Sequence, residues 1–339
     1  MLSSRVFMLK RFFFSAQICC ALLIPALIAP AAAAPARATA QRARPAAIAI
    51  PRAVQFEALP LERSRQNHLL VRAFINGKPA LLGVDSGAPV SAIAISRVSH
   101  FGVKPVRSTP NVPSQLRING SFNQVVTARS LRLGSLNLLD EPMVAIDLRG
   151  SSRAAKMMNE QAIDGILGAD ILFPTHAVLD CRAQRLILKI DPSVRGGVPG
   201  MDYTGFSRVP IHVTPGDNLY VESRMNGQRA KLMVDTGAFA TLLHQPFVRR
   251  MKIPLRETLY SSAGVNMKNR GIQLATISRF SVGSVDMRSK EVGVIDLEGL
   301  IRTGLLNGKT PVAGLLGSEI LERHNAIIDF GTKTLYLKR

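Results

Sequence analysis

The sequence contains one short acidic segment twice. Val84-Asp85-Ser86-Gly87-Ala88 recurs as Val234-Asp235-Thr236-Gly237-Ala238, so the two aspartates lie 150 residues apart. A single Asp-Ser/Thr-Gly triplet is common and means little. Two copies on one chain suggest one site assembled from two halves, each half supplying one carboxyl group.

The repeat extends well beyond these segments. An Asn-Gly pair precedes each aspartate at the same distance, and a Gly-apolar-apolar-Gly segment follows each at 80 and 79 residues. These elements are Asn76-Gly77 and Asn226-Gly227, then Gly165-Ile166-Leu167-Gly168 and Gly314-Leu315-Leu316-Gly317. A repeat of this length with nearly constant spacing indicates an architectural duplication.

The local pattern of each copy predicts mainly β structure. Apolar runs flank the Asn-Gly pair, at residues 69–75 and 80–84 in the first copy and 219–225 and 230–234 in the second. Asn-Gly is the pair most favoured in two-residue hairpin turns. Each hairpin therefore delivers its aspartate to the end of a strand, where a following glycine permits a sharp turn and a close backbone approach. Short helices are expected near residues 97–101 and 246–251.

The N-terminal segment is typical of an exported protein. Arg5, Lys10 and Arg11 precede an apolar run over residues 12–33, and small residues offer a cleavage site, so residues 1–34 are predicted to be a secretory signal. The run is long enough that an uncleaved membrane anchor through residues 12–33 is the alternative. Either way we expect a periplasmic protein, free or anchored facing the periplasm.

Composition divides the rest of the chain into two units. Residues 35–55, rich in Ala, Pro and Arg, are predicted to be a disordered tether, the alternative being a prosegment whose arginines cover an acidic site. The Pro- and Gly-rich residues 192–205 are predicted to be a linker between a first unit at 56–191 and a second at 206–339. Each unit is long enough to bury its own core.

Charge and cysteine content narrow the function classes. The chain carries 43 Lys and Arg against 23 Asp and Glu, a net charge of +20, but it has no Trp and only four Tyr. Without aromatic stacking platforms we predict no nucleic-acid partner. Beyond the signal only Cys181 remains, and the histidines lack metal-ligand spacing, so no metal and no other cofactor are expected.

The paired motifs resemble the retropepsin-like aspartic proteases, here as two units fused in tandem, as in bacterial exported members. The resemblance covers nearly all of residues 56–339. It implies an all-β, bilobal pepsin/retropepsin-like fold with Asp85 and Asp235 as the catalytic pair at the interface between the lobes. It also implies supporting roles: hydroxyls that cross-brace the active loops (Ser86 and Thr236), backbone N–H groups beside the carboxylates (Gly87 and Gly237), and glycines of the segments that back the loops (Gly165, Gly168, Gly314 and Gly317).

The chemistry follows from the pairing of two carboxyl groups. At a separation of about 3 Å both cannot be ionised cheaply, so they share one proton. One can then activate a water as general base while the other donates a proton as general acid. The sequence therefore predicts an aspartic endopeptidase that needs no cofactor and acts on peptides or proteins.

Four other acidic residues are expected to stabilise turns and helix starts and to take no part in catalysis. Asp180 and Asp329 form a second matched pair, but each precedes a polar turn between apolar runs, which favours turn formation. Asp170 and Glu319 follow the Gly-apolar-apolar-Gly segments and are predicted to lie at helix starts.

Several alternatives remain open at the level of sequence. The same fold could serve as a non-catalytic exported peptide-binding module. A monomer is expected, with a swapped dimer as the alternative. Residues 105–122 and 257–271 are the candidates for flexible hairpins over the cleft.

Overall fold

The computed structural model describes residues 55–108, 112–118, 121–191, 198, 201–214, 216–259, 261–263, 270–297 and 312–339, together with a two-residue backbone strand at Leu22–Leu23 (β1). Apart from β1, the predicted signal lies outside the described residues. So do most of the predicted tether and much of the predicted linker. Within the described part, no helix combines the length and the apolar character needed to cross a membrane.

The first copy of the repeat folds into strands with a few short helices. Its elements are β2 (Phe56–Arg63), β3 (Leu69–Ile75), β4 (Lys78–Val84), β5 (Ala92–Ala94), η1 (Ile95–Arg97), α1 (Val98–Phe101), β6 (Lys104–Pro105), β7 (Gln115–Ile118), β8 (Ser121–Leu133), β9 (Leu136–Ile146), α2 (Arg149–Met157), β10 (Gly165–Leu167), α3 (Ala169–Leu172), β11 (Val178–Asp180) and β12 (Arg185–Lys189).

The second copy repeats most of this order. Its elements are β13 (Phe206–Pro210), β14 (His212–Val213), β15 (Leu219–Met225), β16 (Gln228–Val234), β17 (Leu242–His244), α4 (Gln245–Arg250), β18 (Ser261–Ala263), β19 (Arg270–Gly271), β20 (Gln273–Val282), β21 (Val285–Ile295), β22 (Val312–Leu316), α6 (Ser318–Arg323), β23 (Ile327–Asp329) and β24 (Thr334–Lys338). The helices expected near residues 97–101 and 246–251 are confirmed as α1 and α4.

The two predicted hairpins are confirmed. β3 pairs with β4 and β15 with β16, each across a two-residue Asn-Gly turn. Both turn residues have positive φ, 51° and 79° at Asn76 and Gly77 and 47° and 87° at Asn226 and Gly227. This conformation matches the right-handed twist of the flanking strands and requires residues that tolerate the left-handed region. The turn chemistry thus fixes the register that carries each aspartate to its place.

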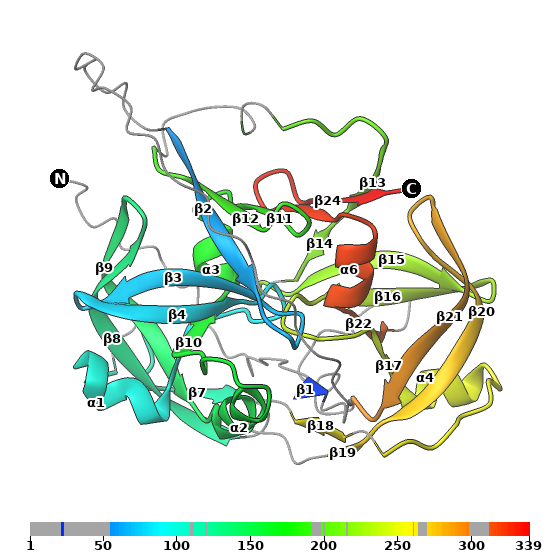
Figure 1. Cartoon of the computed structure of the whole chain (residues 1–339), viewed down its shortest axis with the longest axis horizontal. Coiled ribbons are helices and arrows are strands. Elements are labelled where there is room, and N and C mark those ends of the chain that lie inside the picture. Colours follow the sequence, from blue (N-terminus) through cyan, green and yellow to red (C-terminus); the bar gives the residue numbers. More distant parts are fainter. Residues whose placement is uncertain are drawn as a thin grey trace, which may run out of the picture.

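The duplication is visible in the topology. In the second unit the strand order is β15-β16-β22-β17-β21-β20, and in the first unit the corresponding order is β3-β4-β10-β5-β9-β8. In each, the strand from the Gly-apolar-apolar-Gly segment runs parallel to the strand before the aspartate. Figure 1 shows the resulting two lobes, one built around β3 and β4 and the other around β15 and β16. The fold is all-β and bilobal, as the sequence predicts.

A third layer joins the lobes. The first strand and the two closing strands of each unit lie side by side in the order β13-β24-β23-β11-β12-β2, with β11 and β23 antiparallel across the junction. Leu179 pairs with Ile328 there, and both are fully buried in the large core cluster. The predicted linker at residues 192–205 divides the chain into two consecutive units. This sheet, however, contains strands that precede the linker and strands that follow it. The two units therefore share part of their core.

The first glycine of each Gly-apolar-apolar-Gly segment is required by close packing. A Cβ atom at Gly165 would lie 2.3 Å from the carbonyl oxygen of Ala92, and one at Gly314 would lie 2.0 Å from that of Leu242. Real Cβ contacts are essentially never this short. The central strand of each lobe therefore tolerates no side chain where it passes its neighbour.

We predict that Gly165→Ala lowers the free energy of unfolding by about 1–3 kcal/mol, because the added methyl group forces a backbone shift in a packed sheet. Denaturant titration of the purified protein measures this change. The matched control is Gly271→Ala, since a Cβ at this position meets nothing within 4 Å. Equal stability of Gly165→Ala and the wild type would contradict the packing argument.

Candidate active site

The structure brings the two repeated aspartates together. Asp85 directly follows β4 and Asp235 directly follows β16, and they are 2% and 0% exposed. A Cβ atom at Gly87 would lie 2.6 Å from Cγ of Asp235, and one at Gly237 would lie 2.4 Å from Oδ2 of Asp85. The charge of Asp85 acts directly on the carboxyl group of Asp235. Each loop thus has a glycine, which carries no side chain, at the point where the carboxyl group of the other loop lies.

Backbone N–H groups hold both carboxylates. The N–H of Gly87 donates to Oδ1 of Asp85 at 2.8 Å, and the N–H of Gly237 donates to Oδ1 of Asp235 at 2.9 Å. Ala238 donates a second bond to the same Asp235 oxygen at 3.0 Å. Each glycine therefore contacts the aspartate of its own loop through its N–H group while leaving room for the opposite carboxyl group.

Two hydroxyls connect the loops reciprocally. Ser86 Oγ donates to the carbonyl of Val234 at 2.9 Å and accepts the N–H of Thr236 at 3.1 Å. Thr236 Oγ1 donates to the carbonyl of Val84 at 2.7 Å and accepts the N–H of Ser86 at 2.9 Å. Both residues are buried, at 0% and 1% exposure. Four hydrogen bonds in a dry interface fix one loop against the other.

The Gly-apolar-apolar-Gly segments pass behind the loops. The N–H of Asp85 donates to the carbonyl of Leu167 at 3.0 Å, and that of Asp235 to the carbonyl of Leu316 at 3.1 Å. The second glycine of each segment packs on the loop backbone. A Cβ atom added at Gly168 would lie 2.7 Å from the carbonyl carbon of Val90. One added at Gly317 would lie 2.3 Å from the carbonyl carbon of Ala240. All four predicted glycines thus lie where a side chain would collide with a neighbouring strand, loop or side chain.

The acidic residues at the helix starts also support the loops. Asp170, in the first turn of α3, accepts the N–H and the hydroxyl of Ser91, both at 2.7 Å. Glu319, in the first turn of α6, accepts the N–H of Thr241 at 2.8 Å. Asp180 and Asp329 accept turn N–H groups at 2.8 Å, from Ala183 and Thr332 respectively. The predicted helix-start and turn positions of these four residues are confirmed.

The environment of Asp235 favours its protonated form. Burial first, and the negative charge of Asp85 second, raise the pKa of Asp235 well above its ordinary value of 3.8. The N–H groups of Gly237 and Ala238 oppose this shift, and the hydrogen bond to Asp85 adds to it. A buried pair of carboxyl groups in contact carries one proton most stably.

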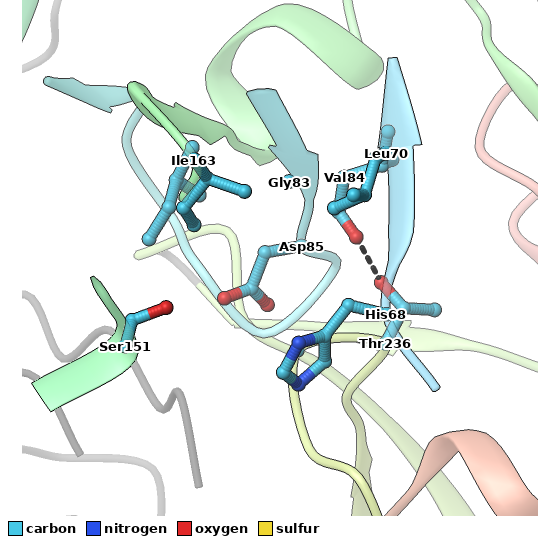
Figure 2. Close-up of a pocket in the computed structure, with 10 residues that line it drawn as sticks. His68, Leu70, Gly83, Val84, Asp85, Ser151, Ile163 and Thr236 are labelled. Atoms are coloured by element: carbon cyan, nitrogen blue, oxygen red, sulfur yellow. Dashed lines mark hydrogen bonds between the residues drawn. The ribbon is translucent and has the colours of Figure 1, made fainter. Parts of the chain in front are cut away.

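A small cavity borders Asp85. Its volume is about 10 Å³, enough for about one water molecule. Figure 2 shows Ser151 from α2 with its hydroxyl directed toward Asp85, and the His68 ring on the opposite side of the carboxyl group. The lining residues are His68, Leu70, Gly83, Val84, Asp85, Ser151, Ile163, Ile166, Thr236 and Gly237.

Sequence reasoning missed two of the polar lining residues. His68 lies eight residues before Asn76, as Asn218 lies eight residues before Asn226, so extending the repeat upstream would have drawn attention to it. Ser151 lies on α2, a helix that the sequence pattern did not predict. Nothing in the local sequence around Ser151 distinguishes it from other surface serines.

Hairpins occur in both stretches proposed as covers. β7 pairs with the start of β8 over residues 115–124, which overlaps the stretch 105–122, and β18 pairs with β19 within residues 257–271. Among the described residues, no three His, Cys, Asp or Glu side chains are grouped as metal ligands would be.

Comparison with protein families agrees with this geometry. A family model described as aspartyl protease matches the chain twice, over residues 71–171 and 221–320. The chain therefore belongs to the aspartyl protease family. One similar solved structure is an aspartic proteinase from Irpex lacteus, with 15% sequence identity and a TM-score of 0.43, covering 84% of this chain and 97% of that one. Among curated proteins, none matches this chain.

The two lobes differ in the charge beside the helix-start acids. In the second lobe Lys290 forms an ion pair with Glu319 at 3.2 Å. The corresponding residue of the first lobe is Glu141, close to Asp170. Burial first, and the charge of Asp170 second, raise the pKa of Glu141 from 4.5 to about 8. Burial also raises the pKa of Asp170 to about 6. The first lobe thus keeps Glu141 protonated at neutral pH.

We predict that Glu141→Gln becomes stabilising as the pH rises. Because the folded pKa exceeds the unfolded one, the folded wild type binds more protons between pH 4.5 and about 8, and its stability falls across this window. Gln does not titrate, so the variant should match the wild type below pH 4.5 and exceed it above pH 8. Melting temperatures over this range, with exposed Glu222→Gln as control, measure the effect. Parallel curves for Glu141→Gln and the wild type would contradict it.

Proposed function

We propose that this chain is an aspartic endopeptidase in which Asp85 and Asp235 form the catalytic pair. The observation that supports this most strongly is reciprocal: a methyl group added to the glycine of either loop, Gly87 or Gly237, would lie within 2.6 Å of the carboxyl group of the other loop. Two isolated turn aspartates would not require this arrangement. Membership of the aspartyl protease family points to the same chemistry.

The proposed mechanism uses the shared proton. The ionised carboxylate takes a proton from a held water, which attacks the peptide carbonyl carbon, while the protonated partner donates to the developing oxyanion. The proton positions then reverse so that the amine leaves in neutral form. The raised pKa of Asp235 is consistent with its holding the proton first. The cross-brace of Ser86 and Thr236 keeps both carboxyl groups in place during the reaction, which limits reorganisation.

We further propose that the enzyme acts outside the cytoplasm as a monomer, in the periplasm or anchored facing it. The basic, then apolar, then small-residue pattern of residues 1–34 supports the location. The hydrogen bonds between both active loops of one chain support a monomer. Its substrates would then be peptides or exported proteins.

Either Asp85→Asn or Asp235→Asn should reduce kcat/KM by about 10²- to 10⁴-fold, the range that general acid–base catalysis supplies. The change keeps the shape of the side chain but removes the shared proton. Mass spectrometry of a mixed peptide library incubated with each purified variant measures the loss. Thr204→Ala, in an exposed turn outside the site, serves as control. Retained binding with no products from the wild type would instead favour a non-catalytic peptide-binding module.

The pH profile of kcat/KM should be bell-shaped with its maximum above about pH 3. Activity falls at low pH when the pair takes up a second proton. It falls again as the pH rises through the raised pKa of Asp235, because the shared proton is lost. A fluorogenic peptide assay across the acid and neutral range measures both limbs. A profile that peaks below about pH 3 would contradict the raised pKa.

A further inference from the structure

Four arginines of the second lobe lie on one exposed face where its two hairpins meet. Arg224 pairs directly with Arg229 across the β15–β16 hairpin, and Arg279 pairs directly with Arg288 across the β20–β21 hairpin. Arg224 also pairs with Ser281, which lies two residues after Arg279 on β20. Directly opposed residues of antiparallel strands, and residues two apart on one strand, share a face of the sheet. All four arginines therefore point to the same side, and all four are exposed.

The backbone beneath these arginines is fixed by hydrogen bonds. The N–H of Asn226, in the β15–β16 turn, donates to the carbonyl of Arg279 at 2.7 Å, and the N–H of Arg279 donates to Oδ1 of Asn226 at 3.0 Å. Figure 1 shows this turn beside β20 at the outer edge of the second lobe. Because neighbouring strands lie about 4.8 Å apart, the strands β16, β15, β20 and β21 hold the four side chains in a row about 15 Å long. We call Arg224, Arg229, Arg279 and Arg288 the arginine row.

The arginine row is unfavourable for the stability of the protein itself. Like charges directly opposite each other on neighbouring strands repel, and here two such pairs lie side by side. Among the described residues, none of the four guanidinium groups takes part in an ion pair, and the ion pairs described in the second lobe use His244, Arg256 and Lys290. Asp286, opposite Ser281 on the same face, balances at most one of the four charges. The uncompensated charge indicates an anionic partner outside the chain.

The first lobe lacks this row although it has the same hairpins. Phe74 pairs with Pro79 across the β3–β4 hairpin, and Ser130 pairs with Leu139 across the β8–β9 hairpin. The register between the two hairpins is also the same in both lobes. The positions that match the four arginines therefore carry no charge in the first lobe. The fold does not require the arginine row, which is specific to the second lobe.

The chemistry of the arginine row favours one kind of partner. A guanidinium group can donate two parallel hydrogen bonds to a phosphate, so four of them in a row suit a surface that presents several phosphates. A stable protein–protein interface has an apolar core, and single-stranded nucleic acid stacks on aromatic side chains. The arginine row contains neither. An anionic lipid surface needs only exposed cations at the height of its headgroups.

We propose that the arginine row docks the protein on the phosphate groups of an anionic phospholipid surface. Arg229 lies near the start of β16, and Asp235 directly follows its end, about 20 Å further along the strand. Docking through the row therefore requires no contact with the aspartate pair. The inference goes beyond the proposed function, because it does not depend on peptide cleavage.

Sedimentation with lipid vesicles tests the docking surface. The full chain is mixed with vesicles of phosphatidylcholine alone and with vesicles that also contain phosphatidylglycerol, over a range of salt concentrations. We expect tighter binding to the anionic vesicles, and the difference should shrink as the salt concentration rises. Binding through the apolar residues 12–33 is common to both kinds of vesicle and cancels in the comparison. Equal binding to both would overturn the proposal.

Two quadruple variants with the same loss of charge separate the arginine row from general basicity. The first carries Arg224→Gln, Arg229→Gln, Arg279→Gln and Arg288→Gln. The second replaces four exposed arginines spread over the rest of the chain by Gln, namely Arg107, Arg153, Arg182 and Arg323. One arginine at an anionic lipid surface contributes about fivefold to binding, so the first variant should bind the anionic vesicles at least about 10²-fold more weakly, and the second should stay within about 10-fold of the wild type. An equal loss in both variants would overturn the proposal.

A melting temperature and two soluble polyanions test the remaining explanations. Without the repulsion between paired arginines, the first variant should melt at or above the temperature of the wild type. A lower melting temperature would show a structural role for the arginines and overturn the docking proposal. Tighter binding of duplex DNA or polyglutamate than of the anionic vesicles would overturn the assignment to lipid, in favour of a nucleic acid or an acidic protein. None of these measurements depends on whether the chain cleaves peptides.

Discussion

The cross-brace between Ser86 and Thr236 is the interaction on which the site depends. Each hydroxyl donates to one backbone carbonyl of the opposite loop and accepts one N–H from it, at 2.7–3.1 Å. Because both residues are buried, water cannot replace these bonds. The brace places Asp85 and Asp235 in contact, and burial together with that contact raises the pKa of Asp235. The hydrogen bonds that join the two loops thus also set the conditions that raise the pKa of Asp235.

Duplication supplies the symmetry of the site, and divergence supplies its differences. Both lobes keep the hairpin, the glycines and a helix-start acid that supports the active loop. They differ at Glu141 and Lys290, where the first lobe sets a protonated acid beside Asp170 and the second forms an ion pair. They differ again at His68, which lines the cavity beside Asp85, and at the corresponding Asn218, whose side chain bonds within its own loop. A catalytic pair needs near-symmetry, whereas recognition of an asymmetric peptide does not.

The parts of the fold that depend on local chemistry could be predicted from the sequence. Asn76-Gly77 and Asn226-Gly227 specify turns, and the glycines of the backing segments mark close backbone approaches. The sheet that joins the lobes was not predictable, because the pairing of β11 with β23 depends on contacts almost 150 residues apart that no local pattern encodes. The same limit applies to His68, whose relation to Gly237 exists only across the lobe interface.

The most direct test of the account is carbon-13 NMR titration of the aspartate carboxyl groups in the wild type and in Asp85→Asn. We expect Asp235 to titrate well above 3.8 in the wild type. In Asp85→Asn its pKa should fall but remain raised, because the neighbouring charge is removed while burial, the larger cause, remains. An Asp235 that titrates at its ordinary value in the wild type, or whose pKa is the same in both proteins, would show that the two carboxyl groups do not interact.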